Sequence, residues 1–116
     1  MIDYDAMTDP QINKAVAIYC GFELHSEDEI SCWVTKFISA GYGPRHVVSL
    51  VSDYCNNWAD AGPIIVENRI TIEAETKGGL WNAYHEDFPA NFVESGLDDD
   101  PLHAAMIVFL KMKEAE

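Results

Sequence analysis

The stretch that most constrains this chain is residues 53–65, which read DYCNNWADAGPII. It places two aromatic residues, a cysteine and two adjacent asparagines ahead of a Gly-Pro pair and an apolar run. Proline is tolerated in the first turn of a helix but costs about 3 kcal/mol in the interior, where it removes a hydrogen bond. We therefore predict that Asp60, and not Asn57, caps a helix that holds Pro63 in its first turn. Residues 53–59 then form a structured loop leading into this helix.

Two other helix starts are clear from capping signals. Thr8 and Gln11 form a T-x-x-Q capping box, and the apolar residues that follow predict a helix ending at Gly21. Asp100 followed by Pro101 is typical of a helix N-terminus. The apolar stripe of this C-terminal helix is wide, which predicts that the helix lies at the centre of the core. The stripe consists of Leu102, Ala105, Met106, Phe109 and Leu110.

Residues 26–38 carry a more ambiguous pattern. Ser26 and Glu29 form an S-x-x-E capping box. The apolar residues that follow repeat at helical spacing: Ile30, Trp33, Val34, Phe37 and Ile38. This spacing predicts a helix, although the composition of residues 32–35 also suits a strand.

Alternation of apolar and polar residues predicts a β-hairpin near the middle of the chain. The strands are residues 70–76 and 80–86, joined by a two-residue loop at Gly78 and Gly79. In that register Ala74 faces Ala83. Residues 46–51 could form a short strand or about one and a half turns of helix, and their β-branched composition favours the strand. Residues 87–99 read as a loop.

These elements predict a single α+β domain over residues 1–116. Three or four helices pack on a small antiparallel sheet that contains the 70–76/80–86 hairpin. The length suits one domain with one core.

Charge is the most unusual bulk property of the chain. Twenty acidic against seven basic residues give a net charge of −13. Binding to nucleic acid or an anionic membrane needs clustered Lys and Arg, so neither is expected as a direct partner. The apolar run at residues 104–110 is too short to cross a bilayer, and an N-terminus that reads MIDYD lacks the positive charge of a signal peptide. We expect a cytoplasmic protein whose acidic residues serve solubility or, on one face, mimic nucleic acid and occupy a basic protein.

Three blocks of the sequence together resemble the NinX-like phage proteins. The blocks are DYDAMTDPQINKAVA at residues 3–17, DYCNNWADAGPIIVENRI at 53–70 and PLHAAMIVFLKM at 101–112. The resemblance implies a small protein encoded by a tailed phage or prophage and acting in a bacterial cytoplasm. It implies no activity, no cofactor and no catalytic residues, and it does not extend to residues 25–52.

The cysteines and histidines do not form a recognised motif. Three cysteines without a secretion signal predict free thiols, with Cys20 and Cys32 on apolar faces and therefore in the core. No metal is expected, because the four histidines lack ligand spacing: His25, His46, His85 and His103. A Cys55-His-Asn catalytic site has no local signature, so the chain is not expected to be an enzyme.

Five residues are candidates for a ligand site: Tyr54, Asn56, Asn57, Trp58 and Asp60. Backbone N–H groups at a helix N-terminus attract anions, amides bond to base edges and aromatic rings stack. Together these groups suit a nucleotide-like ligand. The opposing interpretation is that the asparagines cap turns and helix ends while the aromatics pack in the core.

Size, charge and the resemblance favour a non-enzymatic phage accessory protein that binds a host protein through an acidic surface. The alternative is a small-molecule binder that sequesters a nucleotide-like ligand at residues 54–60 and the following helix N-terminus. A homodimer through the 70–76/80–86 hairpin is expected if Leu80 and Tyr84 are exposed.

Overall fold

Three α-helices and two antiparallel three-stranded sheets form the fold in a computed structural model, which describes residues 3–27, 32–41, 43–75, 78–87 and 91–115. The predicted α+β class is confirmed, but the strands form two sheets in place of one, β1-β2-β3 and β4-β5-β6. In chain order the elements are η1 (Tyr4–Ala6), α1 (Asp9–Tyr19), β1 (Glu23–Glu27), β2 (Cys32–Ala40), β3 (Gly43–Leu50), α2 (Trp58–Glu67), β4 (Thr71–Ala74), β5 (Trp81–Asp87), β6 (Asn91–Asp98) and α3 (Pro101–Glu114).

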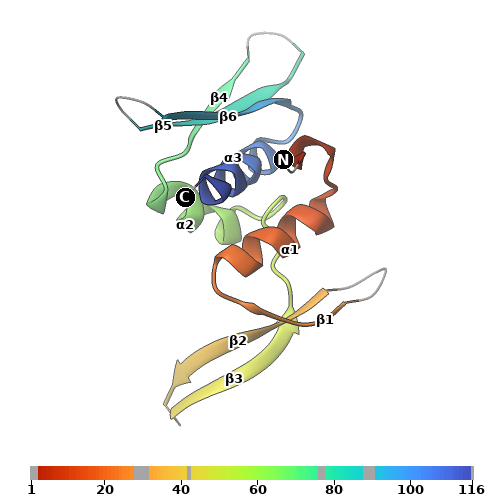
Figure 1. The fold of residues 1–116 in the computed structure, drawn as a ribbon, viewed down its shortest axis with the longest axis vertical. Helices are drawn as coiled ribbons and strands as arrows, with labels where there is room; N and C mark the ends of the chain where they lie inside the picture. The colour runs from red at the N-terminus through yellow and green to blue at the C-terminus, as the bar shows by residue number, and fades with distance from the viewer. Residues whose placement is uncertain (1–2, 28–31, 42, 76–77, 88–90, 116) are drawn as a thin grey trace.

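Helix α3 is the centre of the molecule, as predicted. Every residue from 104 to 110 is buried, so all sides of the helix face protein. Figure 1 shows the β4–β6 sheet on one side of α3 and helices α1 and α2 on the other, while the β1–β3 sheet extends away from the body beyond α1. The predicted start is confirmed: the side chain of Asp100 accepts a hydrogen bond of 3.0 Å from the N–H of Leu102.

Helix α1 begins at the predicted capping box. The N–H of Thr8 donates to Oε1 of Gln11 at 2.9 Å, and the N–H of Gln11 donates to Oγ1 of Thr8 at 3.5 Å. The helix ends at Tyr19, and Gly21 follows with a φ of +95°, a conformation that glycine adopts without strain. The helix that the sequence predicted here is therefore confirmed.

Helix α2 begins earlier than predicted, because Asn57 and not Asp60 is its cap. Oδ1 of Asn57 accepts a hydrogen bond of 2.9 Å from the N–H of Ala59, so Pro63 lies inside the helix. The helix start is fixed by the preceding turn, where the N–H of Asn57 donates to the carbonyl of Asp53 at 3.0 Å. The carbonyl that loses its helical donor to Pro63 is that of Ala59, an exposed residue, so water can replace the missing bond.

The prediction of a helix over residues 26–38 is wrong where the structure describes them. Residues 28–31, including Glu29 and Ile30 of the predicted first turns, lie outside the described residues. Strand β2 follows, paired with β1 on one side and β3 on the other. Aromatic and β-branched residues such as Trp33, Val34 and Thr35 favour this pairing over a helix. The predicted strand at 46–51 is confirmed as part of β3.

The central hairpin exists with a register two residues away from the prediction. Ala74 pairs with Trp81, and Ile72 takes the place opposite Ala83. Beyond the pair of Ala74 and Trp81, the N–H of Glu75 donates to the carbonyl of Leu80 at 2.9 Å, which fits the same register. A shift of two keeps every side chain on its predicted face.

The faces of this hairpin bear on the predicted homodimer. Ala83 is completely buried against the core, whereas Leu80 and Tyr84 are each only partly buried. The homodimer through the hairpin stays a prediction.

Residues 87–99 do not form the predicted loop, because β6 occupies most of them. A bulge at Ser95 and Gly96 breaks the alternation that would have revealed the strand. Gly96 has a φ of +81°, and the Ser95 hydroxyl accepts a hydrogen bond of 3.1 Å from the N–H of Ala83. The serine thereby satisfies a buried backbone donor at the bulge.

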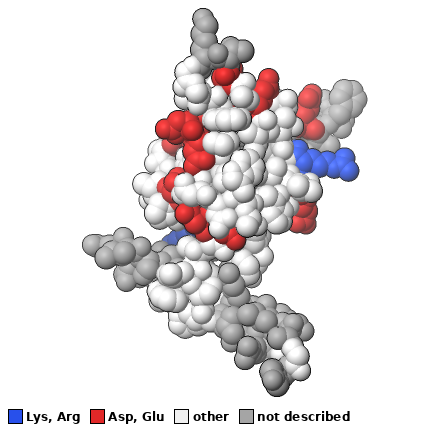
Figure 2. All heavy atoms as spheres, turned by 180° about the vertical axis from the view of Figure 1, so that it is seen from behind, with Lys and Arg blue, Asp and Glu red and all other residues white. Residues whose placement is uncertain are grey.

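Acidic side chains are prominent on the surface. Figure 2 shows them in an arc over the larger, upper part of the molecule, where few Lys and Arg side chains are visible. Lys111 is one base that meets acids: its Nζ lies 3.8 Å from a carboxylate oxygen of Asp5 and donates to the carbonyl of Glu94 at 3.0 Å. Such exposed ion pairs contribute about 0–1 kcal/mol.

Among the residues that the structure describes, none of the helices has the length and apolar character needed to traverse a membrane.

Candidate functional site

The five residues predicted to bind a ligand fall in different environments. Tyr54 is buried in the core, and Asn57 caps α2. Asp60 lies in the first turn of α2, where the helix dipole favours a carboxylate. Trp58 is the one large aromatic of the five at the surface, with 58% of its area exposed. The structure therefore separates Tyr54 from Trp58 and does not bring their rings together on one surface.

Asn56, the fifth predicted residue, belongs to a polar network between α1 and the loop before α2. Its Nδ2 donates to Asp9 at 3.2 Å and to both carboxylate oxygens of Asp53, at 3.1 and 3.2 Å. Asn13 of α1 reinforces this link from inside: its Oδ1 accepts from the N–H of Cys55 at 3.1 Å, and its Nδ2 donates to Asp53 at 3.0 Å. The loop is thus fixed to α1 by amide side chains.

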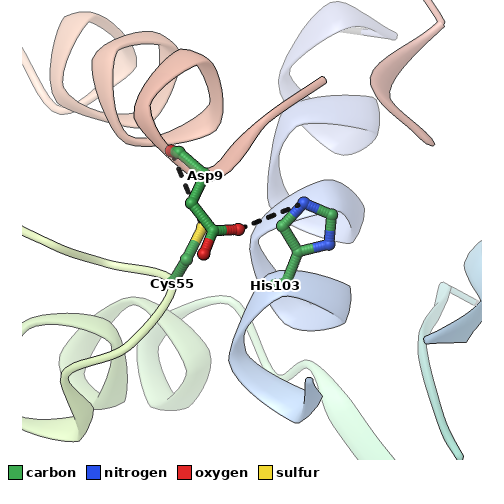
Figure 3. A group of neighbouring side chains, drawn as sticks. All are labelled: Asp9, Cys55 and His103. Carbon is green, nitrogen blue, oxygen red and sulfur yellow. Dashed lines mark hydrogen bonds and ion pairs between the residues drawn. The ribbon is translucent and has the colours of Figure 1, made fainter. Parts of the chain in front are cut away.

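Three residues far apart in the sequence meet beside this network: Asp9, Cys55 and His103 (Figure 3). Asp9 is the first residue of α1, Cys55 lies in the loop before α2, and His103 lies in the first turn of α3. One potential ligand atom from each, a carboxylate oxygen, the thiol sulfur and a ring nitrogen, lies within 4.8 Å of the others. Cys55 is fully buried, and the other two are partly exposed.

The ring of His103 is oriented by two carboxylates. Its Nδ1 lies 2.5 Å from Oδ2 of Asp98, and its Nε2 lies 3.6 Å from Oδ1 of Asp9. Burial lowers the pKa of His103, but the hydrogen bond and charge of Asp98, aided by Asp9, more than offset this, so the pKa is raised above its ordinary value. A positive charge on the His103 ring is therefore favoured.

The thiol of Cys55 is held neutral when no metal is present. Burial raises its pKa far above the ordinary value, and the negative charges of Asp9, Asp100 and Asp53 raise it further. Catalytic cysteines need the opposite, a lowered pKa. The site therefore does not suit a cysteine nucleophile.

Four carboxylates surround this cluster, and we call them the acidic junction: Asp9, Asp53, Asp98 and Asp100. The backbone N–H of Asp100, the N-cap of α3, donates to Oδ1 of Asp98 at the end of β6 at 2.9 Å, which joins both acids to the His103 contact. Asp9 and Asp100 lie at the N-termini of α1 and α3, where helix dipoles favour negative charge. The fold thus tolerates a concentration of carboxylates that would otherwise repel one another.

Asp9 and His103 were not among the residues that the sequence predicted to form a site. Their positions in the first turns of α1 and α3 follow from the predicted caps, but nothing in the sequence indicates that these helix ends meet beside Cys55. The expectation that Cys20 lies in the core is wrong, because that residue is exposed; the side chain of Cys32 lies outside the described part of the structure. Cys20 and Cys55 are free thiols, as predicted.

Burial of Tyr54 predicts a specific sensitivity to alkaline pH. Burial raises the pKa of Tyr54 to about 12, and the nearby Cys20 and Asp60 add to the effect against a lowering contribution from Ser52. An unfolded tyrosine loses its proton near pH 10, so the stability due to the neutral buried phenol is complete below pH 10. It is lost as the pH rises from 10 to 12, and urea unfolding midpoints should fall across that window.

The matched control is Tyr54→Phe, which keeps the ring and removes the titrating hydroxyl. Its unfolding midpoint should fall less between pH 10 and 12 than that of the wild type. The residual fall is assigned to Tyr4, a buried tyrosine whose pKa is also about 12 because of burial and its hydrogen bond to Glu114. Equal slopes for the two proteins would contradict the burial of the Tyr54 hydroxyl.

Comparison with known proteins gives one informative match. The sequence model of the family described as "Bacteriophage P22, NinX" matches residues 3–113, nearly the whole chain, and this range includes every residue of the acidic junction. Comparison with curated proteins finds no match.

Proposed function

Because this chain belongs to the bacteriophage P22 NinX family, we propose that it is a phage-encoded accessory protein that acts in the bacterial cytoplasm and binds a host protein through its acidic surface. The observation that carries this proposal is the acidic junction. Asp9, Asp53, Asp98 and Asp100 gather where α1, α3 and the loop before α2 meet. The proposed partner presents a basic surface.

Neighbouring side chains neutralise only part of the negative charge of the acidic junction. Asn13 and Asn56 donate hydrogen bonds to Asp9 and Asp53, but neutral amides leave the carboxylate charge in place. Clustered charge of one sign raises association rates with an oppositely charged partner and disfavours partners of like charge. The same field repels nucleic acid, which makes a basic protein the preferred class of partner.

Trp58 supplies an apolar anchor next to these charges. Its side chain is 58% exposed, only two residues after Asn56, which contacts the junction directly. Exposed tryptophans of this kind are among the commonest energetic centres of protein interfaces, where truncation costs about 2 kcal/mol or more. We therefore place the interface across the junction and the N-terminus of α2.

The experiment is affinity capture from host lysate followed by a binding titration with the captured protein. Asp53→Asn combined with Asp99→Asn removes two charges at or beside the junction and should weaken binding about tenfold at low salt. Glu73→Gln combined with Glu75→Gln removes two exposed charges on and after β4 and should leave the affinity unchanged. Trp58→Ala should weaken binding by at least as much as the junction pair. Capture of no stoichiometric partner, or equal effects of both charge pairs, would overturn the proposal.

The exposed ring of Trp58 also keeps the small-molecule alternative open. Together with Asn56, Asn57 and Asp60 it lies at the N-terminus of α2, where a nucleotide-like ligand would find a stacking surface and hydrogen-bonding groups. A thermal-shift panel of nucleotides tests this alternative. A ligand at 100 times its Kd should stabilise the fold by about 2.7 kcal/mol, and Trp58→Ala should abolish the shift; no shift with any nucleotide excludes it.

A further inference from the structure

We propose that Asp9, Cys55 and His103 bind one divalent transition-metal ion, with zinc the expected metal. The three residues supply the oxygen, sulfur and nitrogen ligands that zinc prefers. They come from α1, the loop before α2 and α3, so the ion would join three segments that are remote in the sequence (Figure 3). The site shares Asp9 with the acidic junction, but the inference does not rest on the proposed host-protein interface.

The spacing of the ligand atoms is close to that of a formed site. All three lie within 4.8 Å of one another, and Oδ1 of Asp9 is 3.6 Å from Nε2 of His103. In a tetrahedral zinc site, ligand atoms lie roughly 3.2–3.8 Å apart, given Zn–S of about 2.3 Å and Zn–N or Zn–O of about 2.0 Å. Contraction by about 1 Å, within reach of side-chain rotation, completes the geometry.

The partners of these ligands match the arrangement that surrounds metal sites. A metal-bound histidine nearly always donates its second ring nitrogen to a carboxylate or carbonyl. Here Nδ1 of His103 meets Asp98, which leaves Nε2 directed at Asp9 and the cluster. Asp98 is fixed in turn by the N–H of Asp100, and the other oxygen of Asp9 accepts from Asn56 at 3.2 Å. Both the imidazole and the carboxylate are thus oriented before a metal arrives.

Charge and ligand type restrict which ion fits. A Cys55 thiolate and the Asp9 carboxylate together neutralise a divalent cation. Binding replaces the thiol proton of Cys55 and, where the His103 ring is charged, its Nε2 proton, and these protons pass to the buffer. Sulfur and nitrogen ligands disfavour Mg²⁺ and Ca²⁺, which prefer oxygen. The side chain of Asp9 is 41% exposed against 13% for His103, so a fourth ligand such as water would reach the ion from the side of Asp9.

A second arrangement competes for the same residues. A protonated His103 could simply bridge Asp9 and Asp98 as an ion pair, with Cys55 as a buried core residue whose thiol donates to the backbone carbonyl of Asp9 at 4.0 Å and binds no metal. That arrangement predicts no sulfur coordination and no metal-dependent stability. The two can therefore be separated by a measurement that reports on the sulfur atom.

Cobalt(II) titration provides that measurement, because thiolate ligation gives a near-ultraviolet charge-transfer band. The chain has three cysteines, so Cys20→Ser with Cys32→Ser leaves Cys55 as the only thiol. Circular dichroism first checks that this double variant folds cooperatively. It should then bind one cobalt ion, with a thiolate charge-transfer band and the intense d–d bands of tetrahedral cobalt. Zinc should displace the cobalt stoichiometrically and raise the melting temperature.

Single substitutions test each ligand. Added to the double variant, Cys55→Ser should abolish the thiolate band. His103→Gln and Asp9→Asn should each weaken zinc binding at least 100-fold. Asp98→Asn, which removes the charge beside Nδ1 of His103 without changing a ligand, should weaken binding about 10- to 100-fold. His25→Gln alters an exposed histidine on β1 and should change nothing.

The proposal is overturned by any of three results. The first is absence of the thiolate band in the double variant. The second is a band that persists in Cys55→Ser. The third is a zinc affinity unchanged in both His103→Gln and Asp9→Asn, whose side chains are partly exposed and whose folding is checked by circular dichroism.

Discussion

Replacing Asn13 with alanine is expected to lower the free energy of unfolding by about 2–3 kcal/mol. Asn13 is 6% exposed, and its Oδ1 is the hydrogen-bond acceptor that the structure gives to the buried N–H of Cys55. Its Nδ2 also donates to Asp53 at 3.0 Å. Alanine leaves that backbone donor buried without this acceptor, a loss that exceeds the small gain in helix propensity. Urea unfolding followed by circular dichroism measures the change.

The matched control is Asn56→Ala. Asn56 bonds to the same Asp53 carboxylate, but it is exposed, so water can replace its hydrogen bonds. Its substitution should cost less than about 1 kcal/mol. Equal losses of unfolding free energy in the two variants would contradict the claim that the buried hydrogen bond from Cys55 to Asn13 holds the loop against α1.

Replacing Ile107 with alanine is expected to cost about 3 kcal/mol, a large fraction of the total stability of a small domain. Ile107 is 1% exposed and lies in the part of α3 that is buried on every side. Removal of its outer carbons leaves a cavity between α3 and its neighbours, which cannot all move inward together. The change is measured by the same urea unfolding experiment.

Ile18→Ala provides the comparison, because it makes the same chemical change on a helix. Ile18 lies on α1 and is 47% exposed, so its substitution should cost less than about 1 kcal/mol. Similar costs at positions 18 and 107 would contradict the central position of α3.

The helix starts of α1 and α3 could be predicted because their signals are local. The capping box of Thr8 and Gln11 and the Asp100-Pro101 pair act within one turn of backbone, so no tertiary contact is needed to read them. The burial of α3 could also be predicted, since a stripe wider than one face has to be covered on several sides.

The errors arose where tertiary contacts override the local pattern. In residues 32–38 the apolar side chains are three or four residues apart, which fits a helix. These residues nevertheless form a strand, because they pair with β1 and β3. In β6 the bulge at Ser95 and Gly96 shifts the alternation, so the strand does not look like one. In α2 a cap held by the turn at Asp53 outweighs the cost of an internal Pro63.

The cluster of Asp9, Cys55 and His103 could not be predicted from the sequence for a geometric reason. Metal motifs are readable when two ligands share one helix turn or one loop, as in C-x-x-C. Here each ligand comes from a different segment, and only the packing of α1 against α3, with the loop held by Asn13, brings them together. The density of polar and aromatic residues singles out this loop in the sequence, but the sequence does not reveal its contacts with Asp9 and Asn13.

X-ray absorption spectroscopy at the zinc edge tests the central claim, a metal site at this cluster, most directly. The sample is the Cys20→Ser, Cys32→Ser variant loaded with one equivalent of zinc, so any sulfur ligand is Cys55. We predict a four-coordinate ion with one sulfur at about 2.3 Å, lighter ligands at about 2.0 Å and the multiple scattering of one imidazole. A spectrum with oxygen and nitrogen ligands alone, the signature of zinc held loosely by surface carboxylates, would contradict the account.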